Sequence, residues 1–223
     1  MAGPPVIAID GPSASGKGTV AALVARQLGF HYLDSGALYR IVGLVGRERG
    51  ADLDSDSEMS SITLNLNIKF DGHRVWLGGR EVSAAIRGEI AGAAASRVAA
   101  LSGVRTALMT LQRSFRQPPG LVADGRDMGS VVFTDAALKI YLTATAEERA
   151  QRRHKQLIEK GVDASMTALL QDIRERDFRD SNRGVAPLLK CIDAIEIDTT
   201  GISVDTVVAR ILRLFQEKQQ KSQ

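Results

Sequence analysis

One glycine-rich stretch near the N-terminus constrains the fold more than any other feature of the chain. Residues 9–19 read Ile-Asp-Gly-Pro-Ser-Ala-Ser-Gly-Lys-Gly-Thr, after a short apolar run and before a helical pattern. Gly11 and Gly16 let the backbone N–H groups point inward, the helix adds the positive end of its dipole, and Lys17 can reach the outer phosphates of a nucleotide. The stretch predicts a phosphate-binding loop, and the flanking strand and helix disfavour the alternative of a chance glycine-rich turn.

The loop departs from the general pattern at one position. The residue after Lys17, where a Ser or Thr usually contacts magnesium, is Gly18, and the hydroxyl follows at Thr19. The residues that we expect to surround the phosphates are Gly11, Pro12, Ser13, Ala14, Ser15, Gly16, Lys17, Gly18 and Thr19.

Composition limits the class of protein. The 223 residues are 44% hydrophobic and 25% charged, with a net charge of +3, which is typical of a soluble globular chain. No apolar run approaches the roughly 20 residues of a membrane-spanning helix, so we expect a soluble cytoplasmic protein. The single cysteine, Cys191, excludes an internal disulfide, and three scattered histidines lack metal-ligand spacing. We predict no direct protein site for a metal.

Strands and helices alternate through most of the chain. Apolar runs predict five strands, near 5–9, 30–33, 121–123, 138–142 and 194–197, separated by helical patterns. This alternation favours an α/β fold with a five-stranded parallel sheet flanked by helices.

The pattern changes between about 51 and 119. Apolar and polar residues alternate from Leu64 to Phe70, a turn is expected at Asp71-Gly72, and short strands follow at 73–77 and 80–82. Helices are then expected over 90–101 and 104–115. We interpret the segment as an inserted subdomain with a small antiparallel sheet.

A phosphate-binding loop is compatible with a GTPase, an ATP-driven motor or a kinase. The chain is short for a motor and has no Asn-Lys-x-Asp sequence of the kind that recognises guanine. A kinase needs a second site for its acceptor, and arginines could supply one. Arg126 follows a core strand, Arg40 follows the Asp34-Ser35-Gly36 turn, and Arg105 lies in the insertion.

Three further charged residues are spaced like one helix face. Arg176, Asp180 and Arg183 are separated by four and three residues. Their spacing is equally compatible with a solvated ladder of surface ion pairs. In the same way, Asp34 and Ser35 could simply cap a helix, and Arg40 could be an ordinary exposed residue.

The sequence offers no Ser-His-Asp set and no cluster of metal ligands. This favours phosphoryl transfer, which needs mainly Lys, Arg and magnesium. A phosphate acceptor is largely ionised at neutral pH and needs no general base. A hydroxyl acceptor would need a carboxylate, and Asp10, Asp34, Asp124 and Asp127 are candidates. The residue pattern favours a phosphate acceptor and leaves a hydroxyl acceptor open.

Four segments together resemble the bacterial cytidylate kinases, a family of nucleoside monophosphate kinases. They are the loop at 9–19, Leu-Asp-Ser-Gly-Ala-Leu-Tyr-Arg at 33–40, Ala-Asp-Gly-Arg-Asp-Met-Gly at 123–129, and Glu-Arg-Asp-Phe-Arg-Asp-Ser-Asn-Arg at 175–183. The resemblance covers nearly the whole chain, and Gly18-Thr19 is the form that monophosphate kinases generally show.

The resemblance implies a division of the chain and a reaction. Residues 1–36 and 120–223 would form the core, with a short helical lid near 150–165, and 37–119 would form the acceptor-binding segment with its insertion. The implied reaction transfers the γ-phosphoryl group of ATP to CMP or dCMP with Mg²⁺, in pyrimidine nucleotide metabolism. The partners would be these nucleotides alone, with no nucleic acid or membrane, and the protein would be a monomer.

The resemblance also implies roles for individual residues. The loop would hold ATP, and Asp34 and Asp124 would orient magnesium through water. The CMP phosphate would contact Ser35, Arg40, Arg126 and Arg183, the ribose would contact Arg176 and Asp180, and the cytosine would contact Ser96, Arg105 and Asp127. The lid candidates are Arg149, Arg152, Arg153 and Gly161, and the catalytic candidates are Lys17, Arg126, Arg183 and Arg153.

Two other functions stay open at this level. One is a kinase for a small metabolite with a hydroxyl group, on the same fold. The other is a basic module that binds nucleic acid and uses a nucleotide as a switch, which the aromatic content of 4% disfavours.

Overall fold

The computed structural model describes residues 3–71, 74–159 and 161–220, and it divides into two compact units. The core unit comprises Met1–Leu33 and Phe115–Gln223, and the inserted unit comprises Asp34–Ser114. Each unit is described by itself below.

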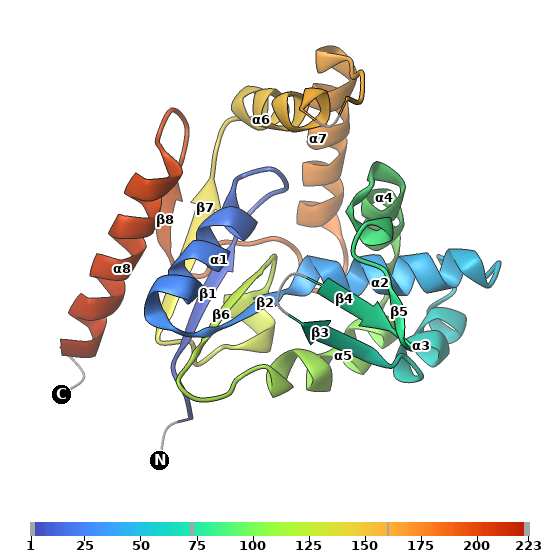
Figure 1. The fold of residues 1–223 in the computed structure, drawn as a ribbon, viewed down its shortest axis with the longest axis horizontal. Coiled ribbons are helices and arrows are strands. Elements are labelled where there is room, and N and C mark those ends of the chain that lie inside the picture. The colour runs from blue at the N-terminus through green and yellow to red at the C-terminus, as the bar shows by residue number, and fades with distance from the viewer. Residues whose placement is uncertain (1–2, 72–73, 160, 221–223) are drawn as a thin grey trace. The chain divides into compact units, whose positions relative to one another are not determined.

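The core unit is built on a five-stranded sheet with the order β2-β6-β1-β7-β8 (Figure 1). The pairings of β1 with β6 and β7, and of β7 with β8, are parallel. The expected parallel α/β core is therefore confirmed. The strands are β1 (Val6–Asp10), β2 (His31–Asp34), β6 (Leu121–Gly125), β7 (Leu138–Thr143) and β8 (Ile195–Asp198).

Two helices cover one face of this sheet. α1 (Lys17–Leu28) follows β1, and α8 (Val204–Gln220) follows β8 and packs against α1 (Figure 1). Ile7 and Ile9 of β1 belong to the same buried cluster as Val24 of α1 and Ile211 of α8. Alternate residues of a strand point to opposite faces, so Asp10 is left to point away from this cluster.

The remaining helices of the core unit follow the carboxyl ends of strands. η2 (Met128–Val132) is a single π-helical turn after β6. α6 (Ala146–Ile158) and α7 (Met166–Asn182) form a helical pair after β7 (Figure 1), joined by a small apolar cluster that includes Leu157, Leu169 and Ile173.

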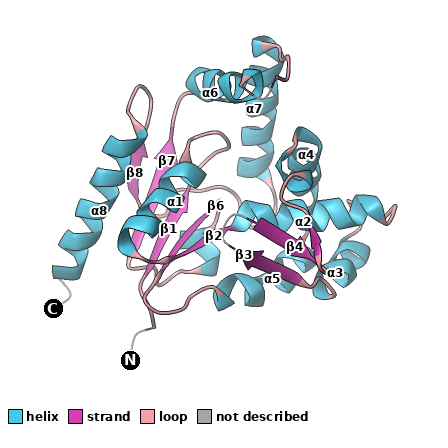
Figure 2. Ribbon diagram, viewed as in Figure 1, coloured by secondary structure: helices cyan, strands magenta, loops and turns pink. Residues whose placement is uncertain are grey.

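The inserted unit combines helices with a three-stranded antiparallel sheet, as expected (Figure 2). Its α2 packs closely on α4. The approach is so close at Gly43 that a Cβ there would lie only 2.8 Å from the Cβ of Ala94. Its elements are α2 (Ser35–Glu48), α3 (Asp56–Leu64), β3 (Ile68–Asp71), β4 (Arg74–Leu77), β5 (Arg80–Glu81), η1 (Ala85–Arg87), α4 (Glu89–Val98) and α5 (Ser102–Ser114).

The expected strand from Leu64 to Phe70 is wrong in its first half. Leu64 is the last residue of α3, and the strand begins at Ile68. Ser55 caps α3 by accepting a hydrogen bond from the N–H of Glu58, a Ser-x-x-Glu signal that outweighs the local alternation. The turn expected at Asp71-Gly72, and the start of the next strand at His73, lie partly outside the described residues.

The expected single helix face for Arg176, Asp180 and Arg183 is also wrong in part. α7 ends at Asn182, and Arg183 has an extended conformation with ψ of 141°. None of the helices within residues 3–71, 74–159 and 161–220 has both the length and the hydropathy to cross a membrane.

Candidate active site

The phosphate-binding loop has the backbone that its glycines predict. Gly11 has a φ of +153°, and a Cβ there would lie 2.0 Å from the carbonyl oxygen of Leu142. Gly16 has a φ of 86° and begins α1 without a side-chain hydrogen bond to the first turn of the helix. Gly16 has no side chain to accept hydrogen bonds from the first N–H groups of α1. These N–H groups can therefore donate to a bound anion.

Two hydroxyl groups in the loop lack protein partners. Ser13 Oγ and Ser15 Oγ are buried, and neither has a hydrogen-bond partner within the described part of the chain. Buried polar atoms are almost always hydrogen-bonded. The geometry of the loop and these two hydroxyls thus fit a polyphosphate, which would supply acceptors for both O–H groups.

Lys17 is held inside the loop. Its Nζ donates a hydrogen bond to the carbonyl oxygen of Pro12 at 2.9 Å. Burial, together with the nearby Arg126 guanidinium, lowers the pKa of Lys17 from 10.5 to about 7. A cation so poorly solvated is stabilised by any bound phosphate, so the site favours an anionic ligand.

Gly18 lies against Asp124. A Cβ at Gly18 would be 3.1 Å from Asp124 Oδ2, and the same oxygen accepts a hydrogen bond from Tyr32 at 3.4 Å. A larger side chain after Lys17 would therefore displace a buried carboxylate at the end of β6. This contact gives a physical reason for the departure from the general loop pattern.

Asp10, one of the candidate bases, is committed to the backbone. Its carboxylate accepts hydrogen bonds from the N–H groups of Met128 and Gly129, both at 2.8 Å. Burial raises the pKa of Asp10 to about 6, and the charge of Asp127 acts in the same direction. Asp10 therefore fixes the turn that follows Asp127, and its two acceptor oxygens are already used.

A cluster of charged residues lies at the end of β6 and along α7. Arg126 Nε donates to Asp180 Oδ2 at 2.8 Å, and Arg183 Nε donates to the carbonyl oxygen of Ala186 at 2.6 Å. Burial raises the pKa of Asp180, but the guanidinium groups of Arg126, Arg176 and Arg183 outweigh it and hold the pKa below its usual value.

The structure thus brings together four predicted residues within the core unit. Asp180 is only 6% exposed, so the alternative of a solvated ladder is wrong for this residue. Asp127, also predicted, is buried directly after Arg126 at the start of η2.

The inserted unit carries the other predicted acceptor residues. Asp34 Oδ1 accepts from the N–H of Ala37 at 3.0 Å and caps α2, which confirms the capping interpretation of Asp34. Ser35 is the buried first residue of that helix. Arg40 Nη1 donates to the carbonyl oxygens of Ile86 at 2.9 Å and Gly88 at 3.1 Å.

Ser96 and Arg105 are placed by α4 and α5. Arg105 is buried, donates to the carbonyl oxygen of Ala99 at 3.3 Å, and lies over the Tyr39 ring, 5.8 Å from its centroid. Ser96 Oγ is buried without a hydrogen-bond partner among the described residues. These two side chains therefore offer a fixed cation and a hydroxyl to a polar ligand.

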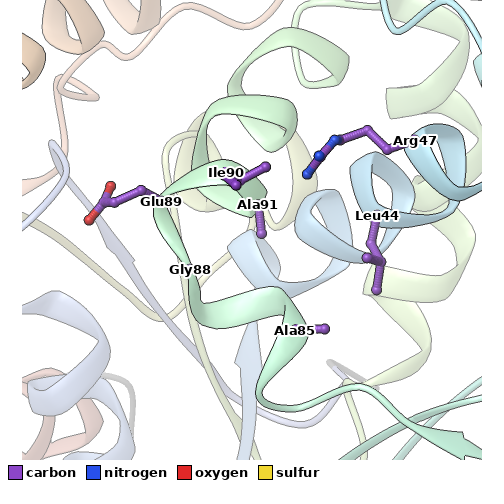
Figure 3. Close-up of a pocket in the computed structure, with 7 residues that line it drawn as sticks. All are labelled: Leu44, Arg47, Ala85, Gly88, Glu89, Ile90 and Ala91. Carbon is purple, nitrogen blue, oxygen red and sulfur yellow. The ribbon is translucent and has the colours of Figure 1, made fainter. Parts of the chain in front are cut away.

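The inserted unit also contains a pocket of about 410 Å³ between α2, η1 and the start of α4 (Figure 3). None of the predicted site residues lines it. The lining residues are Leu44, Arg47, Ala85, Gly88, Glu89, Ile90 and Ala91.

The three lid arginines have different positions. Arg149 is buried and donates to the carbonyl oxygen of Ser13 at 3.2 Å. Arg152 donates to the carbonyl oxygens of Ser15 at 3.4 Å and Thr199 at 2.6 Å. Arg153 is half-buried, with Nη1 3.5 Å from Gln156 Oε1. Two of the three arginines therefore contact the phosphate-binding loop.

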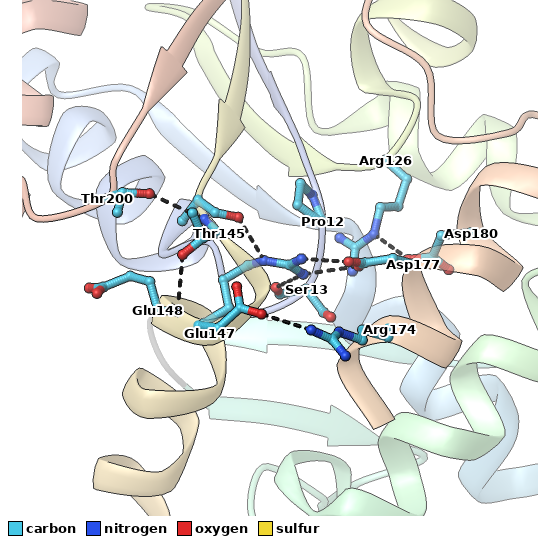
Figure 4. Close-up of polar contacts among 12 residues, drawn as sticks. Pro12, Ser13, Arg126, Thr145, Glu147, Glu148, Arg174, Asp177, Asp180 and Thr200 are labelled. Atoms are coloured by element: carbon cyan, nitrogen blue, oxygen red, sulfur yellow. Dashed lines mark hydrogen bonds and ion pairs between the residues drawn. The ribbon is translucent and has the colours of Figure 1, made fainter. Parts of the chain in front are cut away.

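Two residues of this region were not predicted from the sequence as site residues. Asp177 accepts from Arg149, and Thr199 Oγ1 accepts from Arg152 Nη1 at 2.9 Å (Figure 4 shows the Asp177 contact). Asp177 lies in the segment at 175–183 that carries the family resemblance, but nothing in its spacing distinguishes it. In the described ranges, no three His, Cys, Asp or Glu side chains are grouped to hold a metal ion.

Comparison with known proteins identifies the family. The cytidylate kinase family model matches residues 7–217, which include every site residue described above. The chain belongs to the cytidylate kinase family. It is 56% identical over 213 residues to the cytidylate kinase of Nitrosomonas europaea, with 96% of each chain covered. It is 55% identical over 215 residues to the cytidylate kinase of Chromobacterium violaceum, covering 96% of this chain and 97% of the other.

A solved structure agrees with the fold of this cytidylate kinase family member. A gluconokinase from Sinorhizobium meliloti matches all of both chains with a TM-score of 0.51 at 15% sequence identity. At that identity the likeness concerns the fold alone. The resemblance noted from four sequence segments is thus confirmed for the family and for the kinase fold.

Proposed function

We propose that this member of the cytidylate kinase family transfers the γ-phosphoryl group of ATP to CMP or dCMP, giving ADP and CDP or dCDP. The observation that carries the proposal most directly is the pairing of an anion-binding loop with a separate set of arginines. Lys17 and the loop belong to one set, and Arg126, Arg176 and Arg183 belong to the other. A phosphate donor and a phosphate acceptor each require such a set.

The loop is proposed to bind the phosphates of ATP. The support is the uncapped start of α1, the two buried hydroxyls of Ser13 and Ser15, and the depressed pKa of Lys17. Lys17 is proposed to stabilise the charge that develops on the transferred group, with Arg126, Arg183 and Arg153 as further catalytic residues.

The acceptor is proposed to be a phosphate rather than a hydroxyl. Among the candidate bases, Asp10 already accepts hydrogen bonds from two backbone N–H groups, one on each oxygen, so it offers no free carboxylate oxygen to a hydroxyl proton. A phosphate acceptor is mostly ionised at neutral pH and needs only cations to hold it. Ser35, Arg40, Arg126 and Arg183 are proposed to hold it, and Arg176 and Asp180 to hold the ribose.

Magnesium is proposed to accompany ATP. Asp124 at the end of β6 is the residue that fits best, because its buried carboxylate faces Gly18 beside Lys17. Asp34 is proposed as a second oxygen donor through water. Bound magnesium would neutralise phosphate charge during transfer.

Cytosine is proposed to be recognised by Ser96, Arg105 and Asp127. A carboxylate can accept from the amino group of cytosine, and an arginine can donate to its carbonyl oxygen and ring nitrogen. Arg105 is already fixed by Tyr39 and Ala99, which reduces the loss of side-chain entropy on binding. Uracil lacks this amino group and would leave the carboxylate without a donor, so CMP should be preferred over UMP.

The domain roles follow the same division. The inserted unit, close to the expected 37–119, is proposed to bind the acceptor, and the segment near 150–165 is proposed to act as a lid that excludes water. The protein is proposed to act as a monomer.

The test uses ATP labelled on its γ-phosphoryl group together with magnesium. Label that appears in CDP when CMP is supplied supports the proposal. Label that appears only in inorganic phosphate, at a rate independent of CMP, would overturn it.

A further inference from the structure

Arg149 joins three segments of the core unit that are far apart in sequence. Its Nε donates to the carbonyl oxygen of Ala144 at 3.0 Å, and its Nη1 donates to the carbonyl oxygen of Ser13 at 3.2 Å. Its two terminal nitrogens also hold both oxygens of Asp177, with Nη1 to Oδ1 at 2.9 Å (Figure 4). The guanidinium therefore ties the end of β7, the phosphate-binding loop and α7 together.

This pair differs from another ion pair between the same two helices. The side chains of Arg149 and Asp177 are 5% and 29% exposed, whereas those of Arg174 and Glu147, 2.8 Å apart, are 62% and 58% exposed. An exposed pair contributes little, because water competes for both charges. A bidentate pair with one buried partner fixes geometry, and removal of Asp177 leaves the buried Arg149 charge without its carboxylate.

Asp177 occupies a particular position on α7. It directly follows Arg176 and precedes Asp180 by three residues, and Asp180 holds Arg126 at the end of β6. Two carboxylates of one helix are thus bound to two different arginines. Together they fix the position of α7 and its rotation about its own axis, on which the placement of Arg176 depends.

We propose that the Arg149–Asp177 pair couples the two nucleotide sites. Phosphates bound in the loop fix the backbone at Ser13, which fixes Arg149, and Arg149 then holds Asp177 and α7 in place. Arg176 and Asp180 are thereby positioned before CMP arrives. Asp177 is a positioning residue in this account, since it acts through Arg149 rather than on a substrate. The inference rests on the proposed function for the identity of the two nucleotides.

The proposed coupling between the two nucleotide sites is positive and can be measured. A nucleotide in the loop should raise the affinity for CMP, and CMP should raise the affinity for that nucleotide by the same factor, because coupling between equilibrium affinities is reciprocal. For the unmodified protein we expect a factor of about ten, within the usual range for coupled sites.

The test compares Asp177→Asn with Glu147→Gln, its matched control between the same two helices. Calorimetric titration gives the affinity for CMP with and without a non-hydrolysable ATP analogue, and for the analogue with and without CMP. In Asp177→Asn the coupling factor should fall to about one to two, while each affinity measured alone changes by less than about threefold. Glu147→Gln should keep the coupling of the unmodified protein.

Two outcomes would overturn the inference. One is an unmodified protein that binds both nucleotides without coupling, and the other is Asp177→Asn with the coupling of the control. Failure to bind CMP at all would instead overturn the proposed function and remove the basis of the inference with it. If Asp177→Asn does not fold, Asp177→Glu keeps the charge and should show intermediate coupling, whereas full coupling in Arg149→Lys would contradict the role of the bidentate contact.

Discussion

Asp180 accepts a hydrogen bond from Arg126 Nε at 2.8 Å, with both side chains largely withdrawn from solvent at 9% and 16% exposure. Two residues from distant parts of the chain are therefore paired. Their roles in the account differ, since Arg126 is expected to hold a phosphate and Asp180 a ribose. The pair restricts the motion of both side chains, which lowers the entropy lost when the acceptor binds.

Replacement Asp180→Asn should destabilise the core unit by about 3 kcal/mol, because it leaves Arg126 partly buried without its carboxylate. The control Glu196→Gln breaks the pair with Lys190, in which both side chains are 47% exposed, and should cost less than about 1 kcal/mol. Urea denaturation measures both.

The pH dependence provides a second readout for Asp180. Its pKa is depressed in the folded protein, so its stabilising contribution is present above the ordinary value of 3.8 and is lost as the pH falls through the folded pKa. Equal costs for Asp180→Asn and Glu196→Gln would contradict the proposed importance of this pair.

Replacement Lys17→Met should lower kcat by a factor of about 10² or more, because a cation directed at the transferred group is lost. The fold should survive, since burial disfavours the charged lysine. The folded pKa is about 7 and the unfolded one 10.5, so between these values the unfolded chain binds the extra proton. The stability of the unmodified protein relative to Lys17→Met should therefore rise with pH over this window.

Thermal denaturation at pH 7 and pH 9.5, combined with steady-state kinetics, tests these statements. Near-normal turnover by a folded Lys17→Met protein would contradict the role given to the loop.

Asp10 gives the opposite pH signature. Its pKa is raised from 3.8 to about 6, so the folded protein binds the proton more tightly than the unfolded chain does. The stability of the unmodified protein relative to Asp10→Asn should fall as the pH rises from about 4 to about 6, by up to about 3 kcal/mol, and then level off. Urea denaturation across this range measures the difference, and a rise with pH would show that Asp10 is not desolvated as described.

Replacement Arg105→Met or Asp127→Asn should reduce the preference for CMP over UMP by about ten- to a hundredfold, since an unpaired buried group costs roughly 1–3 kcal/mol. The affinity for ATP should not change, because neither side chain belongs to the loop. Arg49→Met removes an exposed arginine of the inserted unit and serves as the control. The ratio of kcat/KM for CMP to that for UMP gives the preference. An unchanged ratio in both variants would contradict the proposal that Arg105 and Asp127 recognise cytosine.

Much of the fold could be predicted from the sequence, because the informative signals are local. Buried parallel strands form continuous apolar runs, and Gly11, Gly16 and Lys17 stand at fixed spacings in the loop. The order of the strands could not be predicted, since it depends on crossovers that leave no trace in local pattern. The α3 helix was not predicted, although Ser55 and Glu58 form a capping signal at its start.

The site was predicted less completely than the fold. Spacing alone could not distinguish a buried Asp180 from a surface ladder, because the decisive partner, Arg126, lies 54 residues away. Asp177 was missed for the same reason, since its partner Arg149 is on another helix. Asp10 was a candidate base by residue type, and only the structure reveals that Met128 and Gly129 occupy its oxygens. Long-range partners decide what a charged side chain does.

The most direct test of the account is a coupled assay of ADP release from ATP and magnesium with CMP, dCMP, UMP, AMP and GMP offered separately at equal concentration. The account predicts strong activity with CMP and dCMP and at least about tenfold less with UMP. Equal activity with UMP would contradict the roles of Ser96, Arg105 and Asp127. No ADP release with any of the five acceptors would contradict the account as a whole.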